Sequence, residues 1–515
     1  MNLEKGFNIF AGGFLAATVF LFIFWGLEFT GHHYPKLFIL AALFGLFMAF
    51  NIGGNDVANS FGTSVGAGTL SVAQALAIAA VFEVAGALIA GGEVTDTIRK
   101  GIVDMERLHI SPMQLLYIMM SALVAAALWL LFATYKGWPV STTHSVVGSI
   151  VGAALVTGYF TGQPEPLTAV RWGGIGEIVL SWLISPVLGG LMSYLVFYHI
   201  KNHILLLGEI EHEKYALRVN ARRLNSQDKE EKKGEKRKIS LQKKLPMHKR
   251  MLRNLGSLGL MMEGEEEHRL EELDERELPR ARRVRKLYLP LIAVFSVFIV
   301  GYMLIFKGLK NINLGMSDSQ HLLLFLIIGL ASWFIARRFT RGFRSHQLSR
   351  ATYIFFSWLQ VLTASCFAFS HGSNDIANAI GPFAAILEVL KTESLALAAP
   401  IPAYAMLAFG IALVAGLWFI GKEVIATVGT HLAAMSPASG FTAELSAAIV
   451  VLLASSMGLP VSSTHILVGA VLGIGLVNRN ANWRLMKPIA LAWIITVPIA
   501  CMIAAGTCWL FLHFN

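Results

Sequence analysis

Long apolar stretches, separated by short polar segments, run through almost the whole of this 515-residue chain. Thirteen can be recognised, the first near residues 7–27 and the last near 486–512. A helix needs about 20 apolar residues to cross a bilayer, because its backbone polar groups must be satisfied within the segment. Some stretches are shorter or rich in Gly and Ser. We therefore expect an all-α polytopic membrane protein in the lipid bilayer, with about ten to twelve crossings and some broken helices.

Charged residues are scarce except in one segment. Asp, Glu, Lys and Arg make up 14% of the chain, against about 25% in soluble domains. Residues 201–286 hold 23 of the 42 basic and 16 of the 32 acidic residues. We interpret 201–286 as a hydrophilic, charged linker between a first transmembrane half, 1–200, and a second, 287–515, although a regulatory binding module remains open. The basic excess adjoins apolar spans, which favours a membrane and argues against a nucleic-acid partner.

Basic clusters predict the orientation of the linker. One cluster, within 280–286, precedes the span 287–306, and another, within 337–344, follows the span 321–336. Two spans separate the clusters, so both lie on one side, which the positive-inside rule makes cytoplasmic. The first apolar stretch is too long for a signal peptide, and we interpret it as a retained helix. The sequence thus predicts a multi-pass protein of the plasma or inner membrane with a cytoplasmic linker.

Two motifs occur twice, in the same order. NIGGNDVANSFGTSVG at 51–66 matches SHGSNDIANAIGPFAA at 370–385, and WPVSTTHSVVGSIVG at 138–152 matches LPVSSTHILVGAVLG at 459–473. The first pair is offset by 319 residues and the second by 321, which indicates a duplication. Duplicated halves joined by a hydrophilic linker are typical of secondary transporters whose broken helices form a site near the membrane midplane. We expect two homologous repeats, and we prefer the inverted arrangement.

The first motif places a carboxylate at the end of an apolar run in each half. An ionised Asp56 or Asp375 facing lipid would cost about 3 kcal/mol, so each needs a cation, a proton or hydrogen-bond donors. Adjacent glycines permit a break in the helix, and in a wound segment Asn55 and Asn59 would share one face. Such hard oxygen ligands suit Na⁺, or a protonated oxyanion, better than a transition metal. Close helix packing by Asn and Gly is the alternative explanation of the motif.

The second motif places hydroxyl groups after a proline. Proline is favoured at the first helical position, so we expect Pro139 and Pro460 to begin helices. Free backbone N–H groups, hydroxyl donors and the positive end of the dipole would then form an anion site in each half, able to hold a tetrahedral oxyanion. Ordinary capping by Ser and Thr is the alternative. The hydroxyl residues are Ser141, Thr142, Thr143, Ser462, Ser463 and Thr464.

Isolated ionisable residues within the spans are further candidates. Glu83 and Glu444 are lone carboxylates in apolar stretches, where such groups are functional candidates that bind a coupling cation or carry a proton. A polar helix contact is the alternative. His144 and His465 follow the hydroxyls, and we expect them to orient a hydroxyl or pair with a carboxylate, with direct substrate contact as the alternative. His371 precedes only the second Asn-Asp pair, so its role is less defined.

Both paired motifs resemble the signatures of the inorganic phosphate transporter family (PiT, solute carrier family 20). The resemblance covers about residues 37–200 and 350–480, and stretches such as TIRKGIVD at 97–104 and SPASGFTAEL at 436–445 are similar to its sodium-coupled branch. It implies Na⁺/phosphate symport, inverted repeats and a homodimer. It also implies that motif residues line the phosphate and Na⁺ sites, namely Asn55, Asp56, Asn59, Ser141, Thr142, Thr143, Asn374, Asp375, Asn378, Ser462, Ser463 and Thr464, and that Glu83 and Glu444 match acids important in the family.

The resulting hypothesis is a symporter that imports inorganic phosphate with Na⁺ by alternating access, with no resident cofactor and no enzymatic activity. Asp56, Asp375, Glu83 and Glu444 would couple the cation, with Na⁺ at the two aspartates. Proton-coupled transport of phosphate, metal–phosphate or sulfate is the alternative within the same fold. A membrane phosphoryl enzyme and a passive channel are less favoured, because no metal-spaced cluster appears in the loops and buried acids suit tight sites.

Overall fold

The computed structural model describes residues 3–108, 110–163, 165–205, 283–302, 317–341, 348–395, 400–421, 424–425 and 435–514. Most of the predicted linker, 201–286, therefore lies outside the described residues. Within them every regular element is a helix, which confirms the all-α fold. Eleven of these helices are long and apolar enough to cross a membrane, and two shorter apolar helices accompany them. This agrees with the ten to twelve crossings expected from the sequence.

The helices of the first half begin with α1 (Leu3–Phe29). They continue with α2 (Pro35–Ile52), the π-helical turn η1 (Gly53–Val57), α3 (Ala58–Gly66), α4 (Val72–Ala90), α5 (Gly92–Lys100), α6 (Met105–Leu108), α7 (Pro112–Tyr135), α8 (Thr142–Phe160), the short η2 (Pro166–Ala169), α9 (Trp172–Ile200) and η3 (Lys201–Leu205).

The second half is described from η5 onward. Its helices are η5 (Val284–Tyr288), α12 (Leu289–Tyr302), α13 (Asp318–Arg341), α14 (Leu348–Asp375), α15 (Ala377–Thr392), α16 (Ala403–Ile420), α18 (Pro437–Ser456), α19 (Ser463–Asn478) and α20 (Trp483–Phe514).

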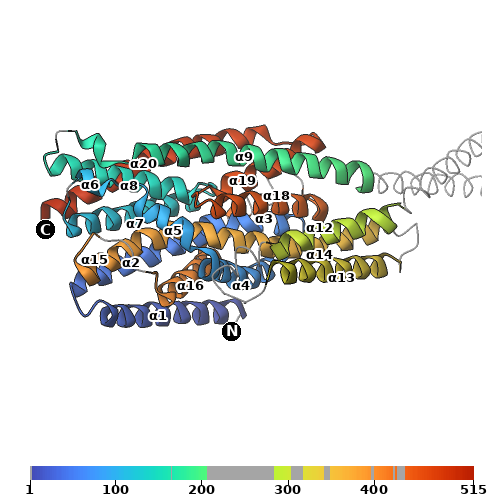
Figure 1. Ribbon diagram of the computed structural model, residues 1–515, viewed down its shortest axis with the longest axis horizontal. Coiled ribbons are helices and arrows are strands. Elements are labelled where there is room, and N and C mark those ends of the chain that lie inside the picture. The colour runs from blue at the N-terminus through green and yellow to red at the C-terminus, as the bar shows by residue number, and fades with distance from the viewer. Residues whose placement is uncertain are drawn as a thin grey trace, which may run out of the picture. The chain divides into compact units, whose positions relative to one another are not determined.

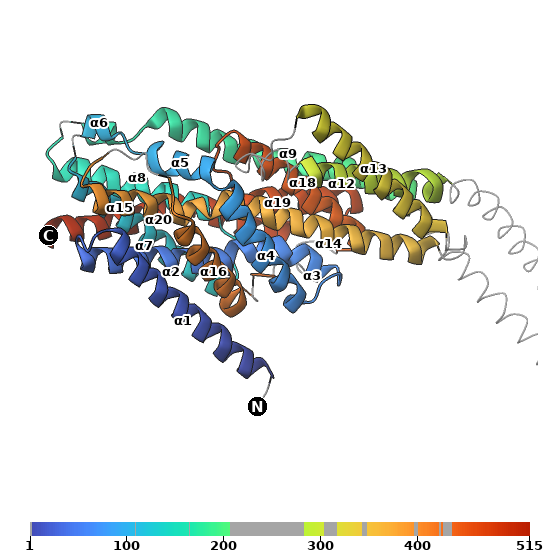
Figure 2. The ribbon, with the colours of Figure 1, turned by 60° about the horizontal axis from the view of Figure 1, so that its bottom comes forward.

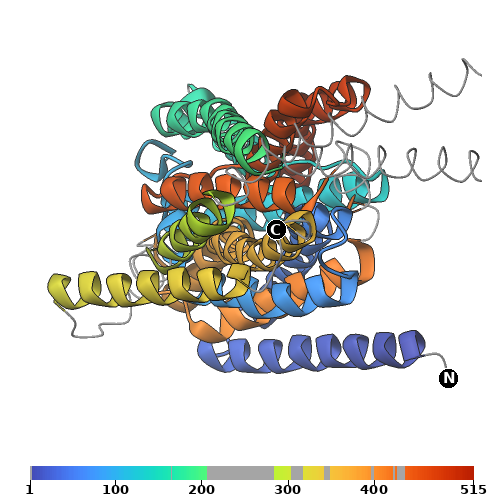
Figure 3. The same ribbon diagram turned by 90° about the vertical axis from the view of Figure 1, so that its right-hand side faces the viewer.

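The chain folds into two compact units. Unit 1 comprises Met1–Tyr198, Ser296–Phe325 and Phe356–Asn515, and unit 2 comprises His199–Phe295 and Leu326–Phe355. Unit 1 contains most of both predicted halves and every candidate site residue, so all that follows concerns unit 1 alone. Within it α1 lies at one edge, against α16 (Figure 3).

Serine residues fix the beginning of several helices. Ser71 and Ser111 each form a capping box, in which the serine hydroxyl accepts from the backbone N–H of a glutamine three residues later. The glutamine side chain in turn accepts from the backbone N–H of the serine. This satisfies N–H groups that the first turn of a helix leaves unpaired.

Both Asn-Asp motifs interrupt a long helix, as expected for broken helices, but they do so differently. In the first copy, Gly53–Val57 widen into a π-helical turn between α2 and α3. In the second, α14 ends at Asp375 and α15 begins at Ala377. Gly53 lets α16 approach the chain closely at the first interruption, because a Cβ on Gly53 would lie 1.7 Å from the carbonyl oxygen of Leu413 in α16.

The two helices that begin after the second motif pack against the opposite half. Helix α8 runs along α20, and α19 runs along α9 (Figures 1 and 2). A Cβ on Gly152 of α8 would lie 2.1 Å from the carbonyl oxygen of Cys501, and one on Gly473 of α19 would lie 2.3 Å from that of Gly190. Glycine is needed at these points for backbones to approach so closely. The halves are thereby interleaved around the duplicated motifs.

Candidate functional site: two aspartates between duplicated helix ends

The first asparagine of each motif holds the segment before a hydroxyl-bearing helix. Asn55 donates through Nδ2 to Thr134 Oγ1 at 3.1 Å and to the carbonyl oxygen of Trp138 at 2.9 Å. Its Oδ1 accepts from the backbone N–H of Val140 at 3.2 Å. The Asn55 amide is thus used to fix the extended segment that leads into α8.

Asn374 makes the equivalent contacts in the second half. Its amide lies 2.9 Å from Ser455 Oγ and 3.4 Å from the carbonyl oxygen of Leu459. With its oxygen and nitrogen exchanged, the amide satisfies more partners, donating to the carbonyl oxygen of Val461 and to Asp375 Oδ1, both at 3.1 Å. Its partners follow those of Asn55 at the offset of the duplicated motifs, so the repeated sequence forms a repeated contact.

Serine, rather than proline, begins the two hydroxyl-bearing helices. Ser141 and Ser462 have extended backbones, and their hydroxyls accept from the backbone N–H groups of His144 and His465, both at 3.2 Å. They are N-caps, and the helices begin one residue later. The expectation that Pro139 and Pro460 occupy the first helical position is therefore wrong. Each proline lies three residues before its helix, and its carbonyl oxygen accepts from a tryptophan instead.

Asp56 receives hydroxyl groups from both halves. Thr142 of α8 donates through Oγ1 to Asp56 Oδ2 at 2.6 Å, and its backbone N–H lies 3.4 Å from the same oxygen. Thr464 of α19 donates to Oδ1. The carboxylate is 2% exposed, and it is stabilised by donors from the first turns of two different helices.

Asp375 has a hydroxyl partner and a histidine partner. Ser463 Oγ donates to Asp375 Oδ2. His371 Nε2 lies 2.8 Å from the same oxygen, at ion-pair distance but outside hydrogen-bond geometry. On its other side, His371 Nδ1 lies 2.9 Å from Glu83 Oε2 of α4. A buried chain of Glu83, His371 and Asp375 results, and it has no counterpart in the first half, where Ile52 takes the place of His371.

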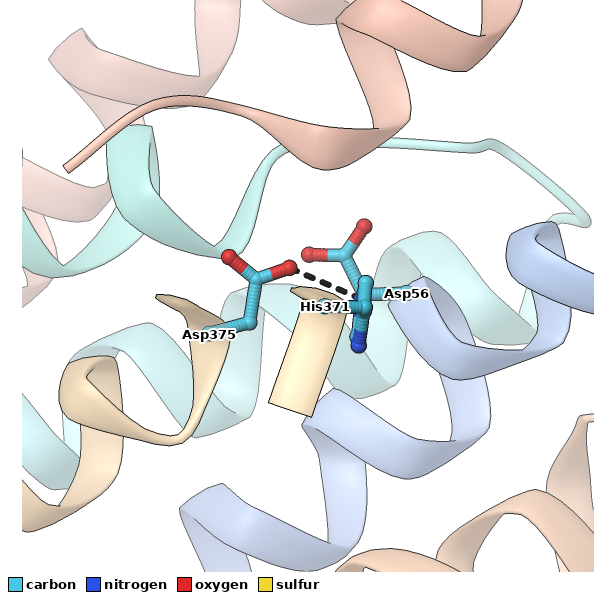
Figure 4. Close-up of side chains that lie close together, drawn as sticks. All are labelled: Asp56, His371 and Asp375. Carbon is cyan, nitrogen blue, oxygen red and sulfur yellow. Dashed lines mark ion pairs between the residues drawn. The ribbon is translucent and has the colours of Figure 1, made fainter. Parts of the chain in front are cut away.

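The two aspartates and His371 lie close together. Their possible ligand atoms are all within 4.8 Å of one another, and all three residues are buried. In Figure 4 both carboxylates point to the same side, and the ion pair joins His371 to Asp375. Sequence reasoning left the role of His371 open. Its place one helical turn before Asp375 was the signal that could have indicated it.

Asn378 adds an amide that crosses between the halves. It donates through Nδ2 to Thr142 Oγ1 at 3.1 Å and to Thr143 Oγ1 at 3.2 Å. Its Oδ1 is buried and has no hydrogen-bond partner among the described residues. Thr143 in turn donates to the carbonyl oxygen of Val461 at 3.0 Å. The side chain of Asn59, the equivalent residue in the first copy, lies outside the described residues.

Glu444 of α18 lies in a second polar cluster. Its Oε1 accepts from Thr63 Oγ1 at 2.7 Å, from Ser64 Oγ and from Gln360 Nε2 at 3.3 Å. Its Oε2 accepts from Thr363 Oγ1 at 2.9 Å. Sequence reasoning missed these four donors, although Gln360 and Thr363 are polar residues one turn apart in the same helix, α14.

The structure thus sorts the predicted site residues into three groups. Asp56, Asp375, Thr142, Thr143, Asn378, Ser463 and Thr464 contact one another around the aspartates, with Glu83 joined through His371. Asn55, Asn374, Ser141 and Ser462 fix the backbone next to this group. Glu444 has its own donors elsewhere in unit 1.

Known proteins resemble this chain over nearly its full length. Residues 52–504 match the phosphate transporter family. This chain belongs to that family. It is 50% identical over 500 residues to a protein of Mycobacterium bovis named as a candidate phosphate permease, covering 95% of this chain and 90% of the relative. It is 35% identical over 480 residues to the inorganic phosphate transporter 2-1, chloroplastic, of Arabidopsis thaliana, covering 91% and 71%.

A solved structure shares the fold of this phosphate transporter family member. That structure is of a sodium-dependent phosphate transporter, which is 32% identical in sequence and superposes with a TM-score of 0.69, covering 92% of this chain and 99% of its own. The family and these relatives are transporters and not enzymes. The sequence-based assignment to a multi-pass phosphate transporter is confirmed. The inverted arrangement of the repeats and the homodimer stay predictions.

Buried charge in this transporter is mostly negative around the site. Arg99 is the one buried Lys or Arg side chain among residues whose burial is described. It pairs with Asp96 at 2.9 Å and with Glu388 at 3.5 Å. The aspartates are instead surrounded by hydroxyls, an amide and a histidine. The site therefore offers neutral donors and helix ends to an anion, and two carboxylates to a cation.

Proposed function

We propose that this phosphate transporter is a secondary active symporter that imports inorganic phosphate together with Na⁺ by alternating access. One observation carries the proposal. Hydroxyl groups from the first turns of α8 and α19, one helix from each half, converge on Asp56, and Asp375 lies beside it. This arrangement supplies anion donors and cation ligands at one buried place.

Phosphate would be bound by donors from both halves. In this structure the hydroxyl and amide hydrogens are donated to protein oxygens, and they would turn to phosphate once cations bind the carboxylates. The residues concerned are Thr142, Thr143, Asn378, Ser463 and Thr464, and the backbone N–H groups of the two first turns would add to them. Ser141, Ser462, Asn55 and Asn374 would contribute through the backbone that they hold in place. Asn59 is proposed by its equivalence to Asn378.

Sodium would be bound by the carboxylates. Phosphate carries one or two negative charges at neutral pH. In the described part of the chain the buried guanidinium of Arg99 pairs with other acids, and none pairs with Asp56 or Asp375. At an effective dielectric constant of about 20, two like unit charges 4 Å apart repel by about 4 kcal/mol. Bound cations remove this repulsion, and Asn378 Oδ1, which lacks a hydrogen-bond partner among the described residues, is a further hard oxygen ligand.

The same charge balance explains coupling. A carrier holding phosphate without cations would bury uncompensated negative charge, so only the empty and the fully loaded states should reorient. Glu83 and Glu444 would bind a coupling cation or carry a proton, and Glu83 lies against His371. The similarity to a sodium-dependent phosphate transporter supports Na⁺ over the proton. We also expect a homodimer. Measuring the molar mass of the purified transporter in detergent tests this expectation.

Uptake into proteoliposomes tests the proposal. The full chain is reconstituted, and labelled phosphate uptake is followed with Na⁺ and pH gradients imposed separately, with sulfate as competitor and with divalent metals chelated. We expect accumulation driven by the Na⁺ gradient, lost when K⁺ replaces Na⁺ and retained when the proton gradient is collapsed. Accumulation that follows only the pH gradient would favour the proton-coupled alternative. Stronger competition by sulfate, or dependence on divalent metal, would change the substrate.

A further inference from the structure

Four aromatic side chains form a row of ring contacts next to the hydroxyl residues. His144 lies against Trp182, and His465 lies against Trp493, with ring centroids 3.8 Å apart in both pairs. The two histidines meet edge to face at 4.5 Å. We call Trp182, His144, His465 and Trp493 the aromatic joint. It connects the two halves, because His144 and Trp182 belong to the first and His465 and Trp493 to the second.

The tryptophan N–H groups tie each half to the other. Trp182 of α9 donates through Nε1 to the carbonyl oxygen of Pro460, and Trp493 of α20 donates to that of Pro139, both at 3.1 Å. Each tryptophan therefore contacts the histidine ring of its own half and holds the segment before the hydroxyl-bearing helix of the other half. The contacts of the joint are thus as duplicated as the motifs.

The histidines contribute ring faces rather than hydrogen bonds. Both ring nitrogens of His144 and Nε2 of His465 are buried without a hydrogen-bond partner among the described residues. The expectation that His144 orients a hydroxyl or pairs with a carboxylate is therefore wrong. The contacts that these residues make to one another are therefore ring contacts.

The joint lies one residue from the hydroxyls that surround the aspartates. Thr143 precedes His144, and Thr464 precedes His465. Thr143 contacts Val461 of the opposite half, and Thr464 contacts Asp56 of the opposite half. The separation of the two rings therefore sets the separation of the two sets of donors. A shift of about 1 Å in such groups can cost up to about a hundredfold in function.

We propose that the aromatic joint positions the first turns of α8 and α19 against each other, so that one anion contacts donors from both halves at once. Trp182, His144, His465 and Trp493 are then positioning residues that do not touch the substrate. This inference rests on the proposed function, because it assigns the anion to the hydroxyl donors of the two helix starts.

Alanine and phenylalanine variants at the histidines test the inference. In His144→Ala and His465→Ala the ring contact is lost, and we expect the KM for phosphate to rise about tenfold, which corresponds to about 1.4 kcal/mol. His144→Phe and His465→Phe keep a flat aromatic ring, somewhat larger than imidazole, and remove its nitrogens. We expect these variants to restore KM to within about twofold of wild type, with maximal rates little changed throughout. An unchanged KM in the alanine variants overturns the inference. So does a failure of phenylalanine to rescue, because the ring nitrogens would then be the groups in use.

Matched tryptophan variants separate positioning from general stability. Trp493→Phe and Trp182→Phe each remove one N–H donor of the joint. Trp129→Phe removes the buried N–H bond from α7 to Thr496 of α20, 3.0 Å long, and leaves the ring and N–H contacts of the joint in place. All three should lower the melting temperature similarly, but only the two joint variants should raise KM. A rise of the same size in Trp129→Phe overturns the inference.

A second measurement keeps the inference apart from the proposed function. If the wild type transports no phosphate, the proposed function fails, whatever the variants do. The joint is then tested by melting temperatures of His144→Ala, His465→Ala and the double variant. Rings in contact should give a loss in the double variant that differs clearly from the sum of the single losses. Strictly additive losses overturn the joint. If the wild type transports phosphate but the joint variants leave its KM unchanged, only the inference fails.

Discussion

The two copies of the Asn-Asp motif share one set of contacts and differ in another. Asn55 and Asn374 hold equivalent backbone segments with equivalent partners. The aspartates differ. Asp56 is bound by two hydroxyls, one from each half, whereas Asp375 is bound by one hydroxyl and lies against His371, which in turn contacts Glu83.

The difference separates two tasks within one duplicated site. The contacts present in both halves position neutral donors, which is what an anion shared between the halves requires. The ionisable group that can change the charge of the site, the pair of Glu83 and His371, occurs once. Under the proposed function, duplication would account for the anion donors, and the departure from it would supply the charge that coupling requires.

The largest expected effect is loss of either aspartate charge. Asp56→Asn and Asp375→Asn keep the size of the side chain but remove the charge that would hold the cation. We expect uptake to fall by at least about a hundredfold in both variants, equivalent to about 2.7 kcal/mol or more, with normal membrane expression. Asp104→Asn, outside the site and near Arg107, is the matched control. Normal uptake by either site variant would refute the role given to that aspartate.

The shared contacts predict equal losses of stability. Asn55→Ala and Asn374→Ala each leave buried backbone groups without their side-chain partner, which costs about 1–3 kcal/mol. Thermal unfolding of the purified variants should show similar decreases in melting temperature. If only one variant is destabilised, the equivalence of the two contacts is wrong. Thr18→Ala, which removes an exposed bond within one helix, should change little.

The unshared contact predicts a change in the cation dependence. His371→Gln keeps a polar side chain near Glu83 but cannot become positively charged. We expect the Na⁺ concentration for half-maximal uptake to shift about tenfold, equivalent to about 1.4 kcal/mol, while the KM for phosphate at saturating Na⁺ stays within about threefold. His33→Gln, an exposed residue, is the control. A shift in phosphate KM without a shift in the Na⁺ dependence would mean that His371 serves the anion.

Much of the fold follows from the sequence, because apolar stretches of about 20 residues leave few alternatives to spanning helices. The duplicated motifs also marked the aspartates and hydroxyls as candidates, because a motif that occurs twice is easier to recognise than one that occurs once. The helix starts at Ser141 and Ser462 were not predicted, because a capping serine and an initial proline compete for the same position.

Other parts of the site depend on contacts between residues far apart in the chain. His371 meets Glu83 across 288 positions, and Ser64 meets Glu444 across 380. Neither pair belongs to a repeated pattern, so no feature of the sequence marks them as partners. The ring contact of His144 with Trp182 could not be predicted for the same reason. Sequence reasoning therefore predicted the residues of the duplicated motifs that the structure brings together, and it missed most of the contacts outside these motifs.

The smallest expected effects distinguish two equivalent threonines. Thr143 donates to the neutral carbonyl oxygen of Val461, and Thr464 donates to the carboxylate of Asp56. Hydrogen bonds to charged groups are worth about 1.5–3 kcal/mol, and neutral ones about 0.5–1.5. Thr464→Val should therefore raise the KM for phosphate about tenfold or more, and Thr143→Val about threefold. Serine at either position restores the hydroxyl and serves as the control. Equal effects of the two valine variants would show that the charge of Asp56 is already neutralised when phosphate binds, and the asymmetry between the halves would then be confined to His371.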